Sequence, residues 1–166
     1  LGADVTAIDA TAEAVEAAKA HLDISRLTIS YKCCTAEELA QEINSRAGKF
    51  DLIYASEVIE HVTDRQLFAE AIASMLCPSG TVVITTINSS LSALAFAKFA
   101  LEYVVRLVPA GTHDPKKFVK PAQLRAEFES VGILLDDITG FVPTLGGGFR
   151  QSGNLAVNYG ASGGWV

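Results

Sequence analysis

The stretch FDLIYASEVIEHVTD, residues 50–64, combines a strong strand signal with an unusual group of charged residues. Residues 50–56 are almost wholly apolar, which is typical of a central strand in a parallel sheet. Glu57, Glu60 and His61 follow directly, although charge is expensive to bury there. The stretch therefore predicts an α/β fold with polar chemistry at the carboxyl end of a strand.

Strands and helices alternate on both sides of this stretch. Residues 3–9 predict a short buried strand ending at Asp9, and residues 27–34 alternate as an edge strand does. TAEE at 35–38 is a capping box that begins a helix, and Asp64 can cap the next one.

The remaining segments continue the alternation. Residues 81–88 predict a buried strand, and a helix begins at Pro121 and ends at Gly132. The tail predicts two strands joined by a glycine-rich turn. We therefore expect one domain over residues 1–166, with a doubly wound, mostly parallel sheet finished by an antiparallel hairpin.

Charge and cysteine content narrow the range of functions. The formal net charge of -6 argues against nucleic acid as a partner, because phosphate binding needs excess Lys and Arg. The 3 cysteines form no even disulfide framework, which favours a reducing compartment. We expect Cys33 and Cys77 to be small buried hydrophobic residues.

The spacing of Glu57, Glu60 and His61 allows two interpretations. If a helix begins at Ser56, all three side chains lie on one face of a single turn and could hold a divalent metal ion. They fit a solvated helix start equally well, because acidic residues are favoured at the positive end of the helix dipole. His61 would then be free to act as a base without metal.

Several segments together resemble one enzyme family. These are residues 49–62 (KFDLIYASEVIEHV), VTAIDA at 5–10, PSGTVVITTIN at 78–88, VPAGTHDPKKFVKPAQL at 108–124 and VNYGA at 157–161. They closely resemble the ubiquinone-biosynthesis O-methyltransferases, which are class I S-adenosylmethionine-dependent enzymes. That family methylates hydroxyl groups on polyprenylated benzene rings, so the resemblance implies this activity on a catechol or benzoquinol intermediate.

The resemblance also implies a Rossmann-like fold and roles for individual residues. Asp9 is expected to bind the ribose of S-adenosylmethionine, and Ser56 is expected to lie against the cofactor. Glu57, Glu60 and His61 are expected to bind Mg²⁺, with Zn²⁺ or Mn²⁺ as alternatives. No other catalytic residue is assigned.

The family's first strand and glycine-rich loop are not found in these 166 residues. We therefore expect this chain alone to bind S-adenosylmethionine poorly and to transfer no methyl group.

Residues 89–118 predict an inserted apolar helix and loop. Within them, residues 91–108 carry a narrow polar stripe of Lys98, Glu102 and Arg106, which fits either a core helix or one lying in a membrane interface. The resemblance favours membrane contact and entry of a polyprenylated phenol.

The resemblance favours a peripheral location on the matrix side of the mitochondrial inner membrane, with the bacterial cytoplasm or inner membrane face as the alternative. Other proteins of ubiquinone synthesis are expected partners. The alternative functions are a non-catalytic lipid- or partner-binding protein of the same fold and a small-molecule methyltransferase outside quinone synthesis.

Overall fold

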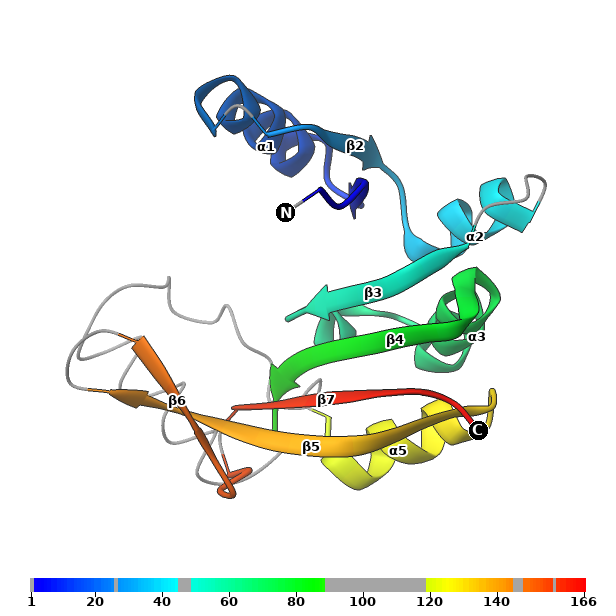
Figure 1. Ribbon diagram of the computed structural model, residues 1–166, viewed down its shortest axis with the longest axis vertical. Coiled ribbons are helices and arrows are strands. Elements are labelled where there is room, and N and C mark those ends of the chain that lie inside the picture. The colour runs from blue at the N-terminus through cyan, green and yellow to red at the C-terminus, as the bar shows by residue number, and fades with distance from the viewer. Residues whose placement is uncertain (1, 26, 45–48, 89–118, 145–147, 157) are drawn as a thin grey trace. The chain divides into compact units, whose positions relative to one another are not determined.

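The computed structural model describes residues 2–25, 27–44, 49–88, 119–144, 148–156 and 158–166 (Figure 1). The chain forms two compact units, Leu1–Gly48 and Lys49–Val166, called unit 1 and unit 2 below. Each unit is described by itself. The prediction of one domain over residues 1–166 stays a prediction.

Unit 1 is a β-α-β-α segment with two parallel strands. Its elements are β1 (Val5–Asp9), α1 (Ala12–Ser25), β2 (Ile29–Cys33) and α2 (Ala36–Asn44). The two strands pair in parallel, with Asp9 opposite Cys33 at their carboxyl ends. The prediction that residues 3–9 are buried is wrong, because every residue of β1 is exposed or half-buried. Within unit 1, β1 has a paired strand on one edge only.

The capping box at the start of α2 is confirmed. The Glu38 backbone N–H donates to Thr35 Oγ1 at 3.2 Å, and the Thr35 backbone N–H donates to Glu38 Oε2 at 2.9 Å. Two backbone donors that the first helical turn leaves free are thereby satisfied. Local sequence therefore defines where α2 begins.

Unit 2 contains a five-stranded sheet in the order β3-β4-β7-β5-β6. Its elements are β3 (Phe50–Ser56), the 3₁₀ helix η1 (Ile59–His61), α3 (Arg65–Met75), β4 (Leu76–Ile87), α5 (Pro121–Glu129), β5 (Ile133–Thr144), β6 (Gly148–Ser152) and β7 (Asn158–Trp165). Strands β3 and β4 are parallel, whereas the β4–β7, β7–β5 and β5–β6 pairs are antiparallel. The α/β class is confirmed, with parallel pairing confined to β1–β2 and β3–β4 among the described strands.

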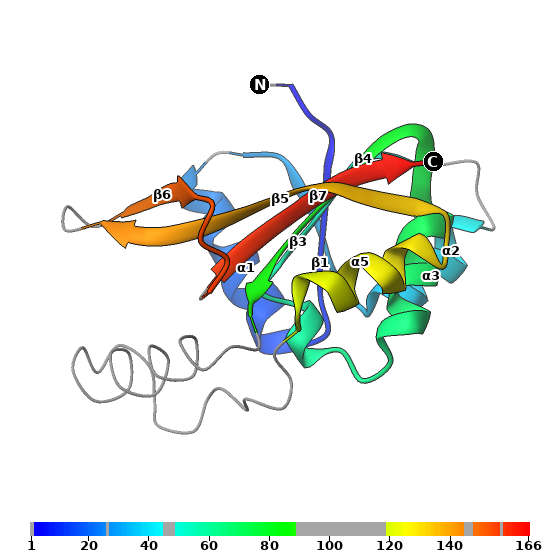
Figure 2. The ribbon, with the colours of Figure 1, turned by 90° about the horizontal axis from the view of Figure 1, so that it is seen from below.

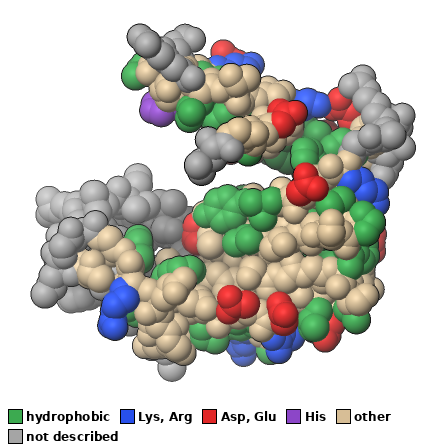
Figure 3. Space-filling view, viewed as in Figure 1, with side chains coloured by type: hydrophobic (Ala, Val, Ile, Leu, Met, Phe, Trp, Pro, Cys, Tyr) green, Lys and Arg blue, Asp and Glu red, His purple; other side chains and the backbone are tan. Residues whose placement is uncertain are grey.

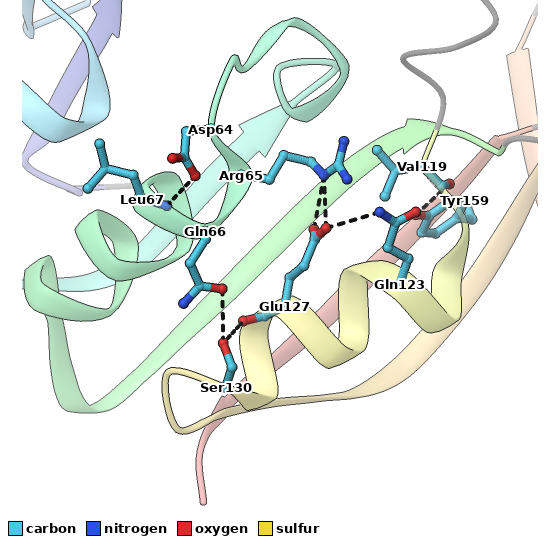
Figure 4. Close-up of polar contacts among 9 residues, drawn as sticks. All are labelled: Asp64, Arg65, Gln66, Leu67, Val119, Gln123, Glu127, Ser130 and Tyr159. Carbon is cyan, nitrogen blue, oxygen red and sulfur yellow. Dashed lines mark hydrogen bonds and ion pairs between the residues drawn. The ribbon is translucent and has the colours of Figure 1, made fainter.

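Helices α3 and α5 lie side by side on one face of this sheet (Figure 2). Arg65 Nε donates to both carboxylate oxygens of Glu127, at 2.9 and 3.1 Å, which joins the two helices (Figure 4). Asp64 caps α3 as predicted, because its Oδ1 accepts the Leu67 N–H at 3.0 Å. The buried side chains beneath the helices include Phe68, Ile72, Met75, Leu124, Phe128, Val82, Ile84, Leu135 and Tyr159.

The predicted ends of α5 are also confirmed. Pro121 occupies the first turn, where a missing N–H costs nothing. Gly132 follows the helix with φ of +84°, a left-handed conformation that glycine adopts easily, and its N–H donates to the Glu129 carbonyl. Pro121 and Gly132 therefore set the two limits of this helix.

Strand β3 is parallel to its neighbour as predicted, but it is an edge strand of the described sheet and not a central one. Its Leu52 and Tyr54 side chains are 59% and 62% exposed. Figure 3 shows hydrophobic side chains gathered over this strand. Residues 50–56 are therefore more apolar than their burial within unit 2 requires.

The tail forms three strands and not the two predicted. Strands β5 and β6 make the antiparallel hairpin, and β7 then inserts between β4 and β5. The close approach of β5 to β7 requires glycine at position 163, because a Cβ there would collide with the Leu134 carbonyl.

The 3 cysteines are free. The prediction of burial is wrong for Cys33, which is exposed at the end of β2, and for Cys77, which is half-buried. The Sγ atom of Cys77 lies 3.5 Å from Asp51 Oδ1, a polar contact that a purely apolar site would not offer.

The predicted inserted helix and loop at 89–118 lie outside the described residues. None of the helices in the described ranges is long and apolar enough to cross a membrane.

Candidate functional site

The chain reverses abruptly at Glu57, immediately after β3. Glu57 has φ of +52°, a left-handed conformation that is rare for a residue with a side chain. Its backbone N–H donates to the Thr85 carbonyl on β4 at 2.9 Å. Beside it, Ser56 Oγ and Thr85 Oγ1 lie 3.0 Å apart. The carboxyl ends of β3 and β4 thus carry a cluster of hydroxyl and carboxyl groups.

No helix begins at Ser56, so the predicted single helical turn does not form. The left-handed residue at 57 interrupts it, and the following turn is the 3₁₀ helix η1 at Ile59–His61. Successive side chains on a 3₁₀ helix point about 120° apart. Glu60 is accordingly buried whereas its neighbour His61 is exposed.

Glu60 is a buried acidic residue, only 5% exposed. Its Oε2 accepts a hydrogen bond from Thr86 Oγ1 at 2.8 Å, and Thr86 is fully buried on β4. A buried carboxylate requires hydrogen-bond donors, because removing it from water costs roughly several kcal/mol when no protein group replaces the lost water.

The side chains of Glu57 and Glu60, called the acidic pair below, interact with each other. Partial burial of the Glu57 carboxyl, repulsion from the Glu60 charge and a hydrogen bond between the two raise the pKa of Glu57 to about 7. A hydrogen bond from Thr85 opposes that rise. Two carboxyl groups that interact in this way do not ionise independently, so a substantial fraction of Glu57 keeps its proton near neutral pH.

The predicted three-residue metal cluster is only partly assembled. Glu57 and Glu60 come together, but in the described part of the chain no three His, Cys, Asp or Glu side chains gather as they would around a metal ion. Two carboxylates still fit Mg²⁺, which is often bound by one or two carboxylates together with water and substrate oxygens. They fit Zn²⁺ less well, because zinc sites in proteins usually include imidazole or thiolate ligands.

Asp9 lies at the carboxyl end of β1, as the sequence predicts. Its Oδ1 accepts the Thr11 backbone N–H at 2.7 Å, and its carbonyl accepts the Cys34 N–H at 3.1 Å. The carboxylate is exposed, with one oxygen engaged in the turn. Because Asp9 belongs to unit 1 and Ser56 to unit 2, the expectation that both contact the same cofactor stays a prediction.

The sequence interpretation missed two residues that contact the candidate site. Thr85 and Thr86 contact Ser56, Glu57 and Glu60 from β4, yet the sequence suggested only a buried strand at 81–88. The available signal was the pair of adjacent hydroxyl residues at the end of an aliphatic run. Parallel pairing places Thr85 directly opposite Ser56.

Comparison with known proteins identifies the fold and the family. Residues 1–84 match the family described as a methyltransferase domain. The fold is similar to that of an S-adenosylmethionine-dependent methyltransferase from Clostridium acetobutylicum ATCC 824, with a TM-score of 0.66, 10% identity and coverage of 98% of this chain and 75% of that one. It is similar also to a structure described for the conversion of a disulfide bond into a thioacetal group during echinomycin biosynthesis, with a TM-score of 0.70, 17% identity and coverage of 99% and 67%. The chain belongs to the methyltransferase domain family.

More specific relatives are ubiquinone biosynthesis O-methyltransferases. The protein of Rhodopseudomonas palustris (strain HaA2) is 40% identical over 160 residues, covering 96% of this chain and 61% of the relative. That of Chelativorans sp. (strain BNC1) is 41% identical over 160 residues, covering 96% and 62%. The resemblance to the ubiquinone biosynthesis O-methyltransferase family is thus confirmed. The chain spans about three fifths of the length of these relatives.

Proposed function

We propose that the protein transfers a methyl group from S-adenosylmethionine to a ring hydroxyl of a polyprenylated catechol or benzoquinol in ubiquinone biosynthesis. The observation that carries the proposal is the acidic pair, which stands beside Ser56 at the carboxyl end of β3. Ligands of open α/β sheets bind at such strand ends. The names of the relatives support both the reaction and the class of substrate.

The chemistry explains the use of two carboxyl groups. A phenol is a poor nucleophile at neutral pH, because its pKa is about 10 and the phenolate is the reactive form. A divalent ion bound by Glu57 and Glu60 would coordinate the catechol oxygens and lower that pKa. The acidic pair supplies negative charge to hold such an ion and to orient the ring. His61 as a third ligand stays a prediction, as do Zn²⁺ and Mn²⁺ in place of Mg²⁺.

Two residues are proposed to hold the cofactor. The free carboxylate oxygen of Asp9 is suited to accept hydrogen bonds from the ribose hydroxyls. The Ser56 hydroxyl, already 3.0 Å from Thr85 Oγ1, is exposed at the end of β3 and is proposed to contact S-adenosylmethionine.

The proposal has three further parts. These are membrane contact through residues 91–108, partners in ubiquinone synthesis and a peripheral inner-membrane location. The relatives named above are bacterial proteins, and they give no support to the mitochondrial location. The bacterial inner membrane face is therefore the location that we propose.

The decisive test is methyl transfer from labelled S-adenosylmethionine to a prenylated catechol by the purified full-length protein. With Mg²⁺ we expect turnover that a chelator abolishes. Glu57→Ala and Glu60→Ala should each reduce turnover about a hundredfold, as is usual when a group acting on the reacting oxygen is removed. Glu70→Ala, an exposed glutamate on α3, is the matched control and should retain full activity.

Activity that survives both the chelator and the two alanine variants would leave the methyltransferase standing and remove the acidic pair from its mechanism. Absence of methyl transfer to every prenylated phenol, with S-adenosylmethionine bound, would overturn the proposed substrate class.

A further inference from the structure

Over residues 82–86, strand β4 has a buried face that carries one polar side chain. Val82, Ile84 and Thr86 alternate along that face, and each is 0% exposed. Valine would occupy the volume of Thr86 without burying a hydroxyl group. A hydroxyl in such a place is unfavourable unless it forms a hydrogen bond. The hydrogen bond that the Thr86 hydroxyl forms therefore explains why a threonine occupies this buried position.

That bond goes to the acidic pair. Thr86 Oγ1 donates to Glu60 Oε2 at 2.8 Å, from a position 26 residues away in the sequence. Glu60 in turn interacts with Glu57, which directly follows β3. The hydroxyl of Thr86 is thus the inner end of a hydrogen-bonded series that leads outward to the exposed Glu57.

The backbone around Thr86 is held on both sides. Its neighbour Thr85 pairs with Ser56 on β3, and Thr86 itself pairs with Tyr159 on β7. Tyr159 is also fully buried, and its hydroxyl donates to the Val119 carbonyl at 3.1 Å. A donor fixed by two neighbouring strands holds its acceptor more accurately than a donor on a loop.

We propose that Thr86 is a positioning residue that fixes the Glu60 carboxylate, and through it the acidic pair, in the orientation needed to hold a divalent ion. The proposal rests on the proposed function for its consequence in catalysis. Its structural part, the hold of Thr86 on Glu60, is independent of which substrate is methylated.

The test compares Thr86→Val, which removes the hydroxyl at nearly constant volume, with Thr86→Ser, which keeps it. Thr81→Val is the matched control, because it makes the same substitution on an exposed residue of the same strand. The first readout is the ¹³C chemical shift of the Glu60 side-chain carboxyl in the full-length protein, assigned with Glu60→Gln and recorded with chelator. The second readout is the separation of kcat from KM for S-adenosylmethionine.

We expect Thr86→Val to shift the Glu60 signal and to lower kcat about tenfold, the effect of one hydrogen bond to a charged group. KM for S-adenosylmethionine should stay within about twofold, because neither Thr86 nor Glu60 is among the residues proposed to hold the cofactor. Thr86→Ser should restore both readouts, and Thr81→Val should change neither. If Thr86→Val fails to fold, Thr86→Ala takes its place with the same expectations.

An unchanged Glu60 signal in the variant without a hydroxyl overturns the proposal, as does failure of Thr86→Ser to restore it. A protein that methylates no prenylated phenol contradicts the proposed function, while the Glu60 signal still decides the role of Thr86.

Discussion

Glu57 combines two unfavourable features at one position. Its backbone lies in the left-handed region, which costs roughly 1–2 kcal/mol for a residue with a Cβ, and its carboxyl is partly buried beside a second one. Glycine would remove the first cost and glutamine the second. Unfavourable backbone conformations of this kind cluster where ligands bind, since the surrounding structure must hold them in place.

The raised pKa of Glu57 predicts how stability depends on pH. In the folded protein this pKa is about 7, against an ordinary value of 4.5. Between these values the folded state binds more protons than the unfolded state, so the free energy of unfolding falls as pH rises through this window. We expect Glu57→Gln to flatten that dependence and to be more stable than the parent at pH above about 7.

Urea titrations at several pH values, with chelator to exclude divalent ions, measure this effect. Parallel curves for the parent protein and Glu57→Gln would contradict the interaction within the acidic pair.

At the scale of single residues, the sequence was informative about identity but not about geometry. It indicated Glu57 and Glu60 because carboxylates behind an apolar strand are unusual. It predicted a helical face because it contains no glycine to mark the left-handed residue at 57. The partners Thr85 and Thr86 became visible only when β4 paired with β3, since contacts between distant segments have no local signature.

Helices were predicted more accurately than strand positions. The capping box at Thr35, the cap at Asp64 and the limits of α5 depend on side chains within one turn, so neighbouring residues determine them. The places of β3 and β7 in the sheet depend on which strands they meet, which residues 50–56 alone do not reveal.

Tyr159 provides a test of one such contact between elements. Burial, followed by the nearby charges of Glu127 and Glu60, raises the pKa of its phenol, so the hydroxyl stays protonated and donates to Val119. We expect Tyr159→Phe to lower the free energy of unfolding by about 1–2 kcal/mol, because a buried carbonyl loses its donor.

The control is Tyr54→Phe on β3, where the side chain is 62% exposed. Its effect should stay within about 0.5 kcal/mol. Chemical denaturation of both variants measures the difference. Equal losses would contradict a specific role for the Tyr159 hydroxyl.

At the scale of the whole molecule, the two units differ in how much core they contain. Among the described residues of unit 1, the buried hydrophobic side chains are Val15, Ala36, Leu39 and Ala40. Its two strands form a two-stranded sheet, which is marginal by itself. Unit 2 has a five-stranded sheet with packed helices and most of the buried side chains.

We therefore expect a fragment of residues 49–166 to fold alone and a fragment of residues 1–48 not to. Circular dichroism should show a cooperative thermal transition for the first fragment and a gradual change for the second, because a chain this short buries too little surface. A cooperative transition in the shorter fragment would contradict this estimate of its core.

The position of β7 in the sheet has a consequence for synthesis of the protein. Translation delivers β3, β4, β5 and β6 before the strand that lies between β4 and β5. Until residues 158–165 emerge from the ribosome, both of those strands present open edges that can pair with other chains. A premature stop codon shortly before position 158 would therefore leave the facing edges of β4 and β5 without a strand between them, and cellular proteases and chaperones would act on the incomplete chain.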